Sequence, residues 1–229
     1  MLLQIAQKTN NHAVADFLTE VLAKLPTEDF YLAILGLFKR GKSTLINAML
    51  GAPILPTGVI PVTSVITRIR YGNKLTAKIS FGDKPEKEVA IEALSEYVTE
   101  AGDPNNVKNV TIADVYVPAP ILRGGLILID TPGVGSTYTA GTQITFQFLD
   151  RVDFAVFVLA VDPPIGQQEL ELLSNLSSKS PKILYVLNKI DYVDPVAVDE
   201  SVNYCQRVIS QHVETKAGSA SKIYPCPPN

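Results

Sequence analysis

The sequence has no excess of basic residues and very few cysteines, and both shortages exclude classes of protein. It contains 20 Lys and Arg against 23 Asp and Glu, for a formal net charge of −3. Proteins that bind nucleic acid usually carry a basic excess, so we expect no nucleic-acid partner. Cys205 and Cys226 show no metal-ligand spacing with each other or with His12 and His212. Two thiols without a disulfide framework fit a reducing compartment.

The sequence also lacks the segments that direct a chain to or through a membrane. Residues 1–8 have neither the basic flank nor the apolar core of a signal peptide. No apolar run approaches the ~18 residues of a membrane-spanning helix. We therefore expect a cytoplasmic protein, whose membrane contact would be peripheral or made by parts outside this chain.

The chain has 229 residues, of which 46% are hydrophobic, and this is enough for the core of one sizeable α/β domain. Apolar segments that read as buried strands alternate with helical segments, which predicts a mostly parallel sheet with helices on both faces. Such sheets bind ligands at the carboxyl ends of their strands. The predicted strands include 30–35, 110–117, 126–130, 154–161 and 183–187. Two further strands, 65–71 and 75–81, flank Gly72-Asn73-Lys74 and predict a β-hairpin.

The first 28 residues predict a separate amphipathic helix. Val14, Phe17, Val21 and Leu25 recur at helical spacing before Pro26. The apolar face either packs on its own domain or joins a helical bundle whose other members lie elsewhere. We divide the chain accordingly into residues 1–28 and the domain 29–229.

The segment Gly36–Ser43 fits the phosphate-binding pattern G-x-x-x-x-G-K-[ST] in full, between a predicted strand and a predicted helix. Gly36 and Gly41 let backbone N–H groups point at phosphate oxygens, and the helix dipole adds to them. Lys42 is expected to reach the β- and γ-phosphates, and the Ser43 hydroxyl to ligate Mg²⁺. We place Lys39, Arg40 and Thr44 in the same nucleotide-binding set.

Two later motifs follow apolar strands and separate a GTPase from an ATPase. In Asp130-Thr131-Pro132-Gly133 the Asp130 carboxylate is expected to hold Mg²⁺, and the Gly133 N–H to sense the γ-phosphate. An ordinary turn around Pro132 would give the same tetrapeptide.

In Asn188-Lys189-Ile190-Asp191 the carboxylate of Asp191 can accept hydrogen bonds from N1–H and the exocyclic amine of guanine, a pair that adenine lacks. Lys189 would lie along the base, and Asn188 would brace the phosphate loop. The three motifs in this order predict binding of GTP and GDP with Mg²⁺.

These residues resemble the GTPase superfamily, and the stretches Lys42–Gly51 and Leu55–Ser64 resemble the bacterial dynamin-like branch, over roughly residues 30–225. The resemblance implies that Thr63 is the switch threonine, a Mg²⁺ ligand that helps to position the attacking water. Thr67 and Thr57 are its rivals. It also implies slow basal GTP hydrolysis, stimulated when two G domains dimerise across the nucleotide, and a role in membrane remodelling or fusion.

Lys39 occupies the position at which one dynamin relative carries an arginine finger and dynamins proper carry a serine that coordinates a monovalent cation. We hypothesise that Lys39 supplies this positive charge itself. The alternatives are a solvated lysine or a bound monovalent cation. With Val134 in place of the water-orienting glutamine of Ras-like enzymes, this chain cannot use that route. We therefore count Lys39, Lys42, Thr63 and Gly133 as the candidate catalytic residues.

Two departures from the dynamin-like pattern concern the end of the chain. Relatives carry Ser-Ala after the last strand, with an N–H aimed at guanine, whereas this chain has Tyr224-Pro225-Cys226-Pro227-Pro228, and proline has no N–H. The chain also stops where a dynamin continues into helices, so we expect a fragment or a minimal G domain. Gln143, Gln147 and the 162–164 segment could meet a partner but have no assigned role.

Two other functions are compatible with the same motifs. An Era-type GTPase switch in ribosome assembly would need an RNA-binding module and usually a basic balance. A non-catalytic nucleotide-binding scaffold would not need the complete set of Lys42, Ser43, Thr63 and Asp130.

Overall fold

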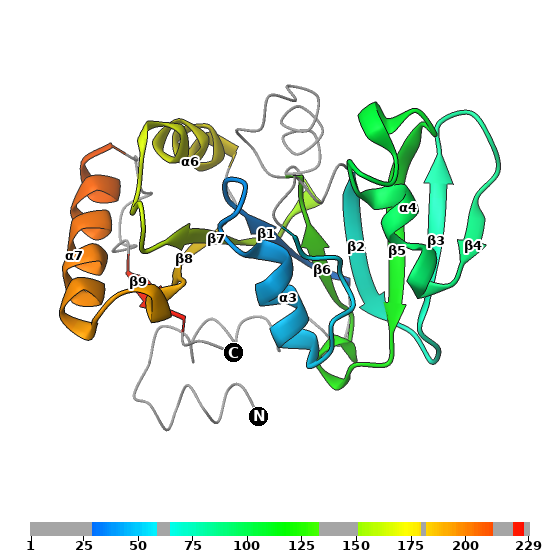
Figure 1. Ribbon diagram of the computed structural model, residues 1–229, viewed down its shortest axis with the longest axis horizontal. Helices are drawn as coiled ribbons and strands as arrows, with labels where there is room; N and C mark the ends of the chain where they lie inside the picture. Colours follow the sequence, from blue (N-terminus) through cyan, green and yellow to red (C-terminus); the bar gives the residue numbers. More distant parts are fainter. Residues whose placement is uncertain (1–28, 59–64, 133–150, 180–181, 213–221, 227–229) are drawn as a thin grey trace.

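The computed structural model describes residues 29–58, 65–132, 151–179, 182–212 and 222–226 (Figure 1). The predicted helix 1–28, the candidates Thr63 and Gly133, and Val134, Gln143 and Gln147 lie outside these ranges. The strands are β1 Phe30–Leu35, β2 Ile66–Tyr71, β3 Thr76–Phe81, β4 Lys87–Val89, β5 Val110–Val117, β6 Leu126–Asp130, β7 Phe154–Ala160, β8 Lys182–Asn188 and β9 Ile223–Pro225. The α-helices are α3 Lys42–Leu50, α4 Ser95–Val98, α6 Gln167–Lys179 and α7 Pro195–His212, and the 3₁₀ turns are η1 Ile91–Ala93, η2 Pro104–Asn106, η3 Pro120–Leu122 and η5 Ile190–Tyr192.

Within the described residues the strands form one nine-stranded sheet in the order β4-β3-β5-β2-β6-β1-β7-β8-β9 (Figure 1). The half from β6 to β9 is parallel throughout, while β2 runs antiparallel to β6, and β3 runs antiparallel to β4 and β5. Every residue of β7 is buried, as expected for a central strand covered on both faces. The predicted α/β fold with a mostly parallel sheet is confirmed.

Alternate residues of the strands point to opposite faces of the sheet. Each face forms its own core with the helices packed on it. One core contains Ile34 and Leu128 with Ile46 of α3. The other contains Phe157 with Leu173 of α6 and Ile209 of α7. Asp194 caps the amino end of α7, since the Ala197 N–H donates to Asp194 Oδ1 at 3.0 Å.

The predicted hairpin of segments 65–71 and 75–81 is wrong, because β5 lies between β2 and β3. β2 pairs with β5 in parallel, and β3 pairs with β5 from the other side. The Gly72 N–H donates to Val117 O at 3.1 Å, and a Cβ on Gly72 would lie 2.6 Å from Tyr116 Cβ. The glycine therefore lets the connection cross the end of β5, a role that a turn signal alone does not distinguish from a hairpin.

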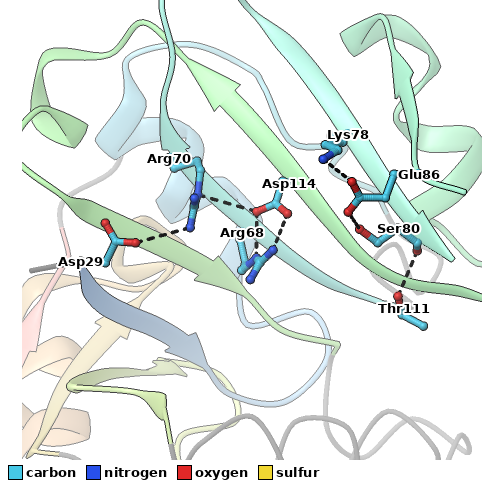
Figure 2. Close-up of polar contacts among 8 residues, drawn as sticks. All are labelled: Asp29, Arg68, Arg70, Lys78, Ser80, Glu86, Thr111 and Asp114. Atoms are coloured by element: carbon cyan, nitrogen blue, oxygen red, sulfur yellow. Dashed lines mark hydrogen bonds and ion pairs between the residues drawn. The ribbon is translucent and has the colours of Figure 1, made fainter. Parts of the chain in front are cut away.

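The outer strands carry polar side chains on one face (Figure 2). Arg68 of β2 binds the Asp114 carboxylate of β5 through two nitrogens, with the Nε contact at 2.8 Å. Arg70 lies between two acids. Its Nε is 3.7 Å from Asp114 Oδ1, and its Nη2 is 3.8 Å from Asp29 Oδ2. Lys78 pairs with Glu86 further along the same face. These charges are largely matched with each other, so the face needs no ligand to balance it.

Candidate functional site

The phosphate loop connects β1 to α3, and its backbone has the conformation that the glycines predict. Gly36 and Gly41 have φ of 142° and 94°. A Cβ would lie 2.5 Å from Val158 O at Gly36 and 2.2 Å from Asn188 Nδ2 at Gly41. Neither position can therefore accept a side chain without a shift of its neighbours.

The amino end of α3 is prepared for an anion. Gly41 is its N-cap, no side chain caps the helix, and its first turn carries no acidic residue. The positive end of the helix dipole and the first N–H groups are therefore not neutralised by the protein itself. Thr44 is exposed in this first turn.

Lys42 is only 7% exposed, and its Nζ donates to Leu37 O at 3.2 Å. Burial lowers the pKa of Lys42 from its usual value, and the nearby Asp130 carboxylate partly opposes this shift. The buried Lys42 ammonium, whose Nζ donates to Leu37 O at the start of the loop, would be strongly stabilised by a negative charge placed next to it. The position thus suits a phosphate oxygen.

The Ser43 hydroxyl donates to Asp130 Oδ2 at 2.8 Å, which brings the first and second motifs together. Asp130 ends β6 and is 1% exposed. A hydroxyl and a carboxylate are both hard oxygen donors, and Mg²⁺ is usually bound by one or two such protein groups, with the rest of its shell from water and phosphate. These two residues fit Mg²⁺. The described residues contain no group of three His, Cys, Asp or Glu that would form a separate metal cage.

The two alternative candidates for the switch threonine, Thr57 and Thr67, both lie within the described residues. Neither is a buried residue of a loop. Thr57 is exposed, whereas Thr67 is 1% exposed inside β2, opposite Asp130 in the β2–β6 register. A threonine fixed in a strand cannot move with a switch loop. The Thr131 hydroxyl is also engaged within the protein. It donates to Ile34 O at 3.0 Å and so joins the end of β6 to β1.

The third motif meets the phosphate loop from the end of β8. Asn188 Nδ2 donates to the Arg40 carbonyl oxygen at 2.9 Å, which confirms that Asn188 braces the loop. Lys189 follows with φ of 61°, and its Nζ lies 5.6 Å from the centre of the Tyr192 ring. Asp191 is exposed in the 3₁₀ turn η5. Its carboxylate is thus accessible to a base.

The cationic residues of the phosphate loop differ in their surroundings. Lys39 is exposed, with its Nζ 5.4 Å from the centre of the Phe38 ring. The Arg40 side chain is instead buried and bound to Glu169 of α6 and to the Pro163 carbonyl oxygen. Only the backbone N–H of Arg40 is left to serve the nucleotide-binding role predicted for it. Glu169 carries no signal in the sequence that would mark it as a partner of Arg40, since an acid in the first turn of a helix is common for electrostatic reasons alone.

The last described strand is paired at its end. β9 lies parallel to β8, and the Cys226 N–H donates to Leu187 O at 2.8 Å. This N–H is therefore used within the sheet, and Pro225 has none to give. Burial raises the pKa of Cys226, as it raises that of the fully buried Cys205 to about 11, so neither thiol is a reactive thiolate at neutral pH.

Comparisons with known proteins give a consistent set of relatives. An uncharacterized protein in the xynA 3′ region of Caldicellulosiruptor sp. is 39% identical over 97% of this chain and 54% of its own length. Dynamin-like protein 2 of Campylobacter jejuni is 29% identical over 88% of the chain and 32% of its own length. The chain thus spans about half or less of the length of these relatives.

Solved structures share the fold. A bacterial dynamin, part of an oligomerised pair described in long-range sensing and tethering of membranes, matches 95% of the chain with a TM-score of 0.66 and 24% identity. Era matches 86% with a TM-score of 0.51 and 19% identity. The model of the dynamin family matches residues 32–190, which include most of β1, the phosphate loop, Asp130 and Asn188. The chain therefore belongs to the dynamin family and carries its P-loop GTPase fold.

Proposed function

We propose that this chain is the G domain of a bacterial dynamin-like protein that binds GTP with Mg²⁺ and hydrolyses it to GDP and phosphate. One observation carries the proposal: Ser43, Asp130 and Asn188, from three separate motifs, converge on the phosphate loop through hydrogen bonds of 2.8 and 2.9 Å. A chance match to three short motifs would not bring them to the same strand ends.

The residues have distinct tasks in this proposal. The loop N–H groups and Lys42 bind the phosphates, and they stabilise the charge that develops on the transferred group. Ser43, Asp130 and the switch threonine Thr63 would hold Mg²⁺, which would supply Lewis-acid neutralisation of the phosphate charge. Gly133 would sense the γ-phosphate. Asp191 selects guanine by accepting its two adjacent N–H donors.

Lys39 is proposed to supply positive charge at the transition state, in place of a monovalent cation. Its exposed ammonium is not bound into the protein core and is free to turn toward a nucleotide. We expect Lys39→Ala to lower kcat about tenfold to a hundredfold with little change in KM, measured by phosphate release in potassium and in sodium. Unchanged turnover in both salts would reject this role.

We further propose that two G domains dimerise across the nucleotide, and that the whole protein acts in membrane remodelling or fusion through parts outside this chain. Among the described residues, no helix has the length and apolarity to span a membrane. The proposed location is cytoplasmic, peripheral at the membrane, without a nucleic-acid partner.

GTP hydrolysis measured over a hundredfold range of protein concentration tests this function. We expect specific activity to rise with concentration, because a dimer would complete the catalytic site. Constant specific activity would favour an Era-type switch, and nucleotide binding without turnover would favour a scaffold. A size measurement with a transition-state analogue of GTP would show whether the active species is the dimer.

A further inference from the structure

A buried ion pair joins the phosphate loop to the first turn of α6. Arg40 is 8% exposed and Glu169 is 1% exposed. Arg40 Nε donates to Glu169 Oε1 at 2.8 Å, and Nη2 donates to the same oxygen. Nη1 donates to Pro163 O at 2.9 Å, while Glu169 Oε2 accepts the Gly166 N–H at 3.0 Å.

The Arg40–Glu169 pair fixes the backbone around Arg40, whose conformation is not one that the local sequence would favour by itself. Lys39 and Gly41, on either side of Arg40, both have positive φ, at 63° and 94°. A left-handed non-glycine residue such as Lys39 persists only where its surroundings determine the conformation. Arg40 provides such surroundings at both ends, since Asn188 binds its carbonyl oxygen and Glu169 binds its guanidinium.

The guanidinium is not available to a phosphate in this arrangement. Each of its three nitrogens already donates to Glu169, Pro163 or Pro164. An effect of Arg40 on nucleotide binding must therefore pass through the shape of the loop and not through direct contact between its charge and the ligand.

We propose that Arg40 is a positioning residue which, with Glu169, holds the phosphate loop open in the conformation that receives the β-phosphate of GDP and GTP. The inference rests on the proposed function. It adds that the loop at residues 162–166 and the amino end of α6 are mechanically joined to the nucleotide site. Displacement of either element would loosen the phosphate loop and release nucleotide.

The test compares two double variants with the same chemistry. Arg40→Met with Glu169→Gln removes both charges together, so that no buried charge is left unpaired, and it keeps an amide oxygen for the Gly166 N–H. The matched control, Arg68→Met with Asp114→Asn, removes another arginine–carboxylate pair, which joins β2 to β5 on the outer part of the sheet (Figure 2).

Binding of GDP and of GTP with Mg²⁺ is measured by calorimetry well below the melting temperature of each variant. We expect the Arg40/Glu169 variant to bind both nucleotides roughly tenfold more weakly, because misplacement of a binding group by even a fraction of an ångström is costly. The Arg68/Asp114 variant should bind like the wild type, even if its melting temperature falls equally.

Wild-type affinity in the Arg40/Glu169 variant would overturn the inference while leaving the proposed function intact. Failure of the wild-type protein to bind either nucleotide would instead reject the proposed function. Should the double variant not fold, Arg40→Lys keeps the charge but loses the contact through two nitrogens. A smaller loss of affinity is then expected, and unchanged affinity would again overturn the positioning role.

Discussion

Replacing Lys42 with alanine is expected to weaken GTP and GDP binding about a thousandfold and to abolish measurable hydrolysis. An ammonium and a phosphate charge ~4 Å apart attract by about 4 kcal/mol at the effective dielectric of a protein surface. This energy corresponds to roughly three orders of magnitude in affinity. Because burial lowers the pKa of Lys42 in the free protein, affinity should also fall as pH rises through that lowered pKa, at which the ammonium is lost.

Calorimetry with Mg²⁺ present, over a pH series, measures both effects. Lys78→Ala is a suitable control, because Lys78 is an exposed lysine paired with Glu86 on the outer strands. It should leave both affinities unchanged. Tight GTP binding by a folded Lys42→Ala protein would mean that the loop does not hold the phosphates.

Replacing Asp191 with asparagine is expected to change the ratio of GTP to xanthosine triphosphate affinity by roughly 10⁴-fold. The carboxylate can accept from both N1–H and the exocyclic amine of guanine, whereas a carboxamide donates where the amine donates. Xanthine presents a carbonyl oxygen in place of that amine, so it pairs with asparagine and not with aspartate. The exposed position of Asp191 in η5 means that this change should cost little stability.

Competition between the two nucleotides for a fluorescent analogue measures the ratio directly. Asp199→Asn makes the same change at another exposed carboxylate, on α7, and should keep the preference for guanine. If Asp191→Asn keeps wild-type GTP affinity and still rejects xanthosine triphosphate, another residue selects the base.

Strongly patterned features could be predicted from the sequence. The strands β1, β6 and β7 are continuous apolar runs, and β1, β6 and β8 each lead into a motif whose residue types are those expected for contact with a nucleotide or with Mg²⁺. Because parallel strands place their carboxyl ends along one edge, motif order was enough to predict that Ser43 and Asp130 lie together. Asn188 could be placed against the phosphate loop by the same reasoning.

Features that depend on which distant segments pair could not be predicted in this way. Gly72 marks a turn in either arrangement, and only the insertion of β5 between β2 and β3 decides against the hairpin. Arg40 looked like another cation for phosphate, because a sequence shows its charge but not the direction of its side chain. Its partner Glu169 is 129 residues away, and no local pattern links the two.

The sequence by itself determined the candidate residues of the site, since the demands of a triphosphate, a magnesium ion and a guanine base restrict residue types at short, fixed spacings. It also determined the α/β class, because burial of strands on both faces leaves a visible apolar pattern. Strand order and the ion pair that secures the phosphate loop were decided only in the tertiary structure. Both arise from contacts between segments remote in the chain, whose energies depend on burial and geometry that no local spacing records.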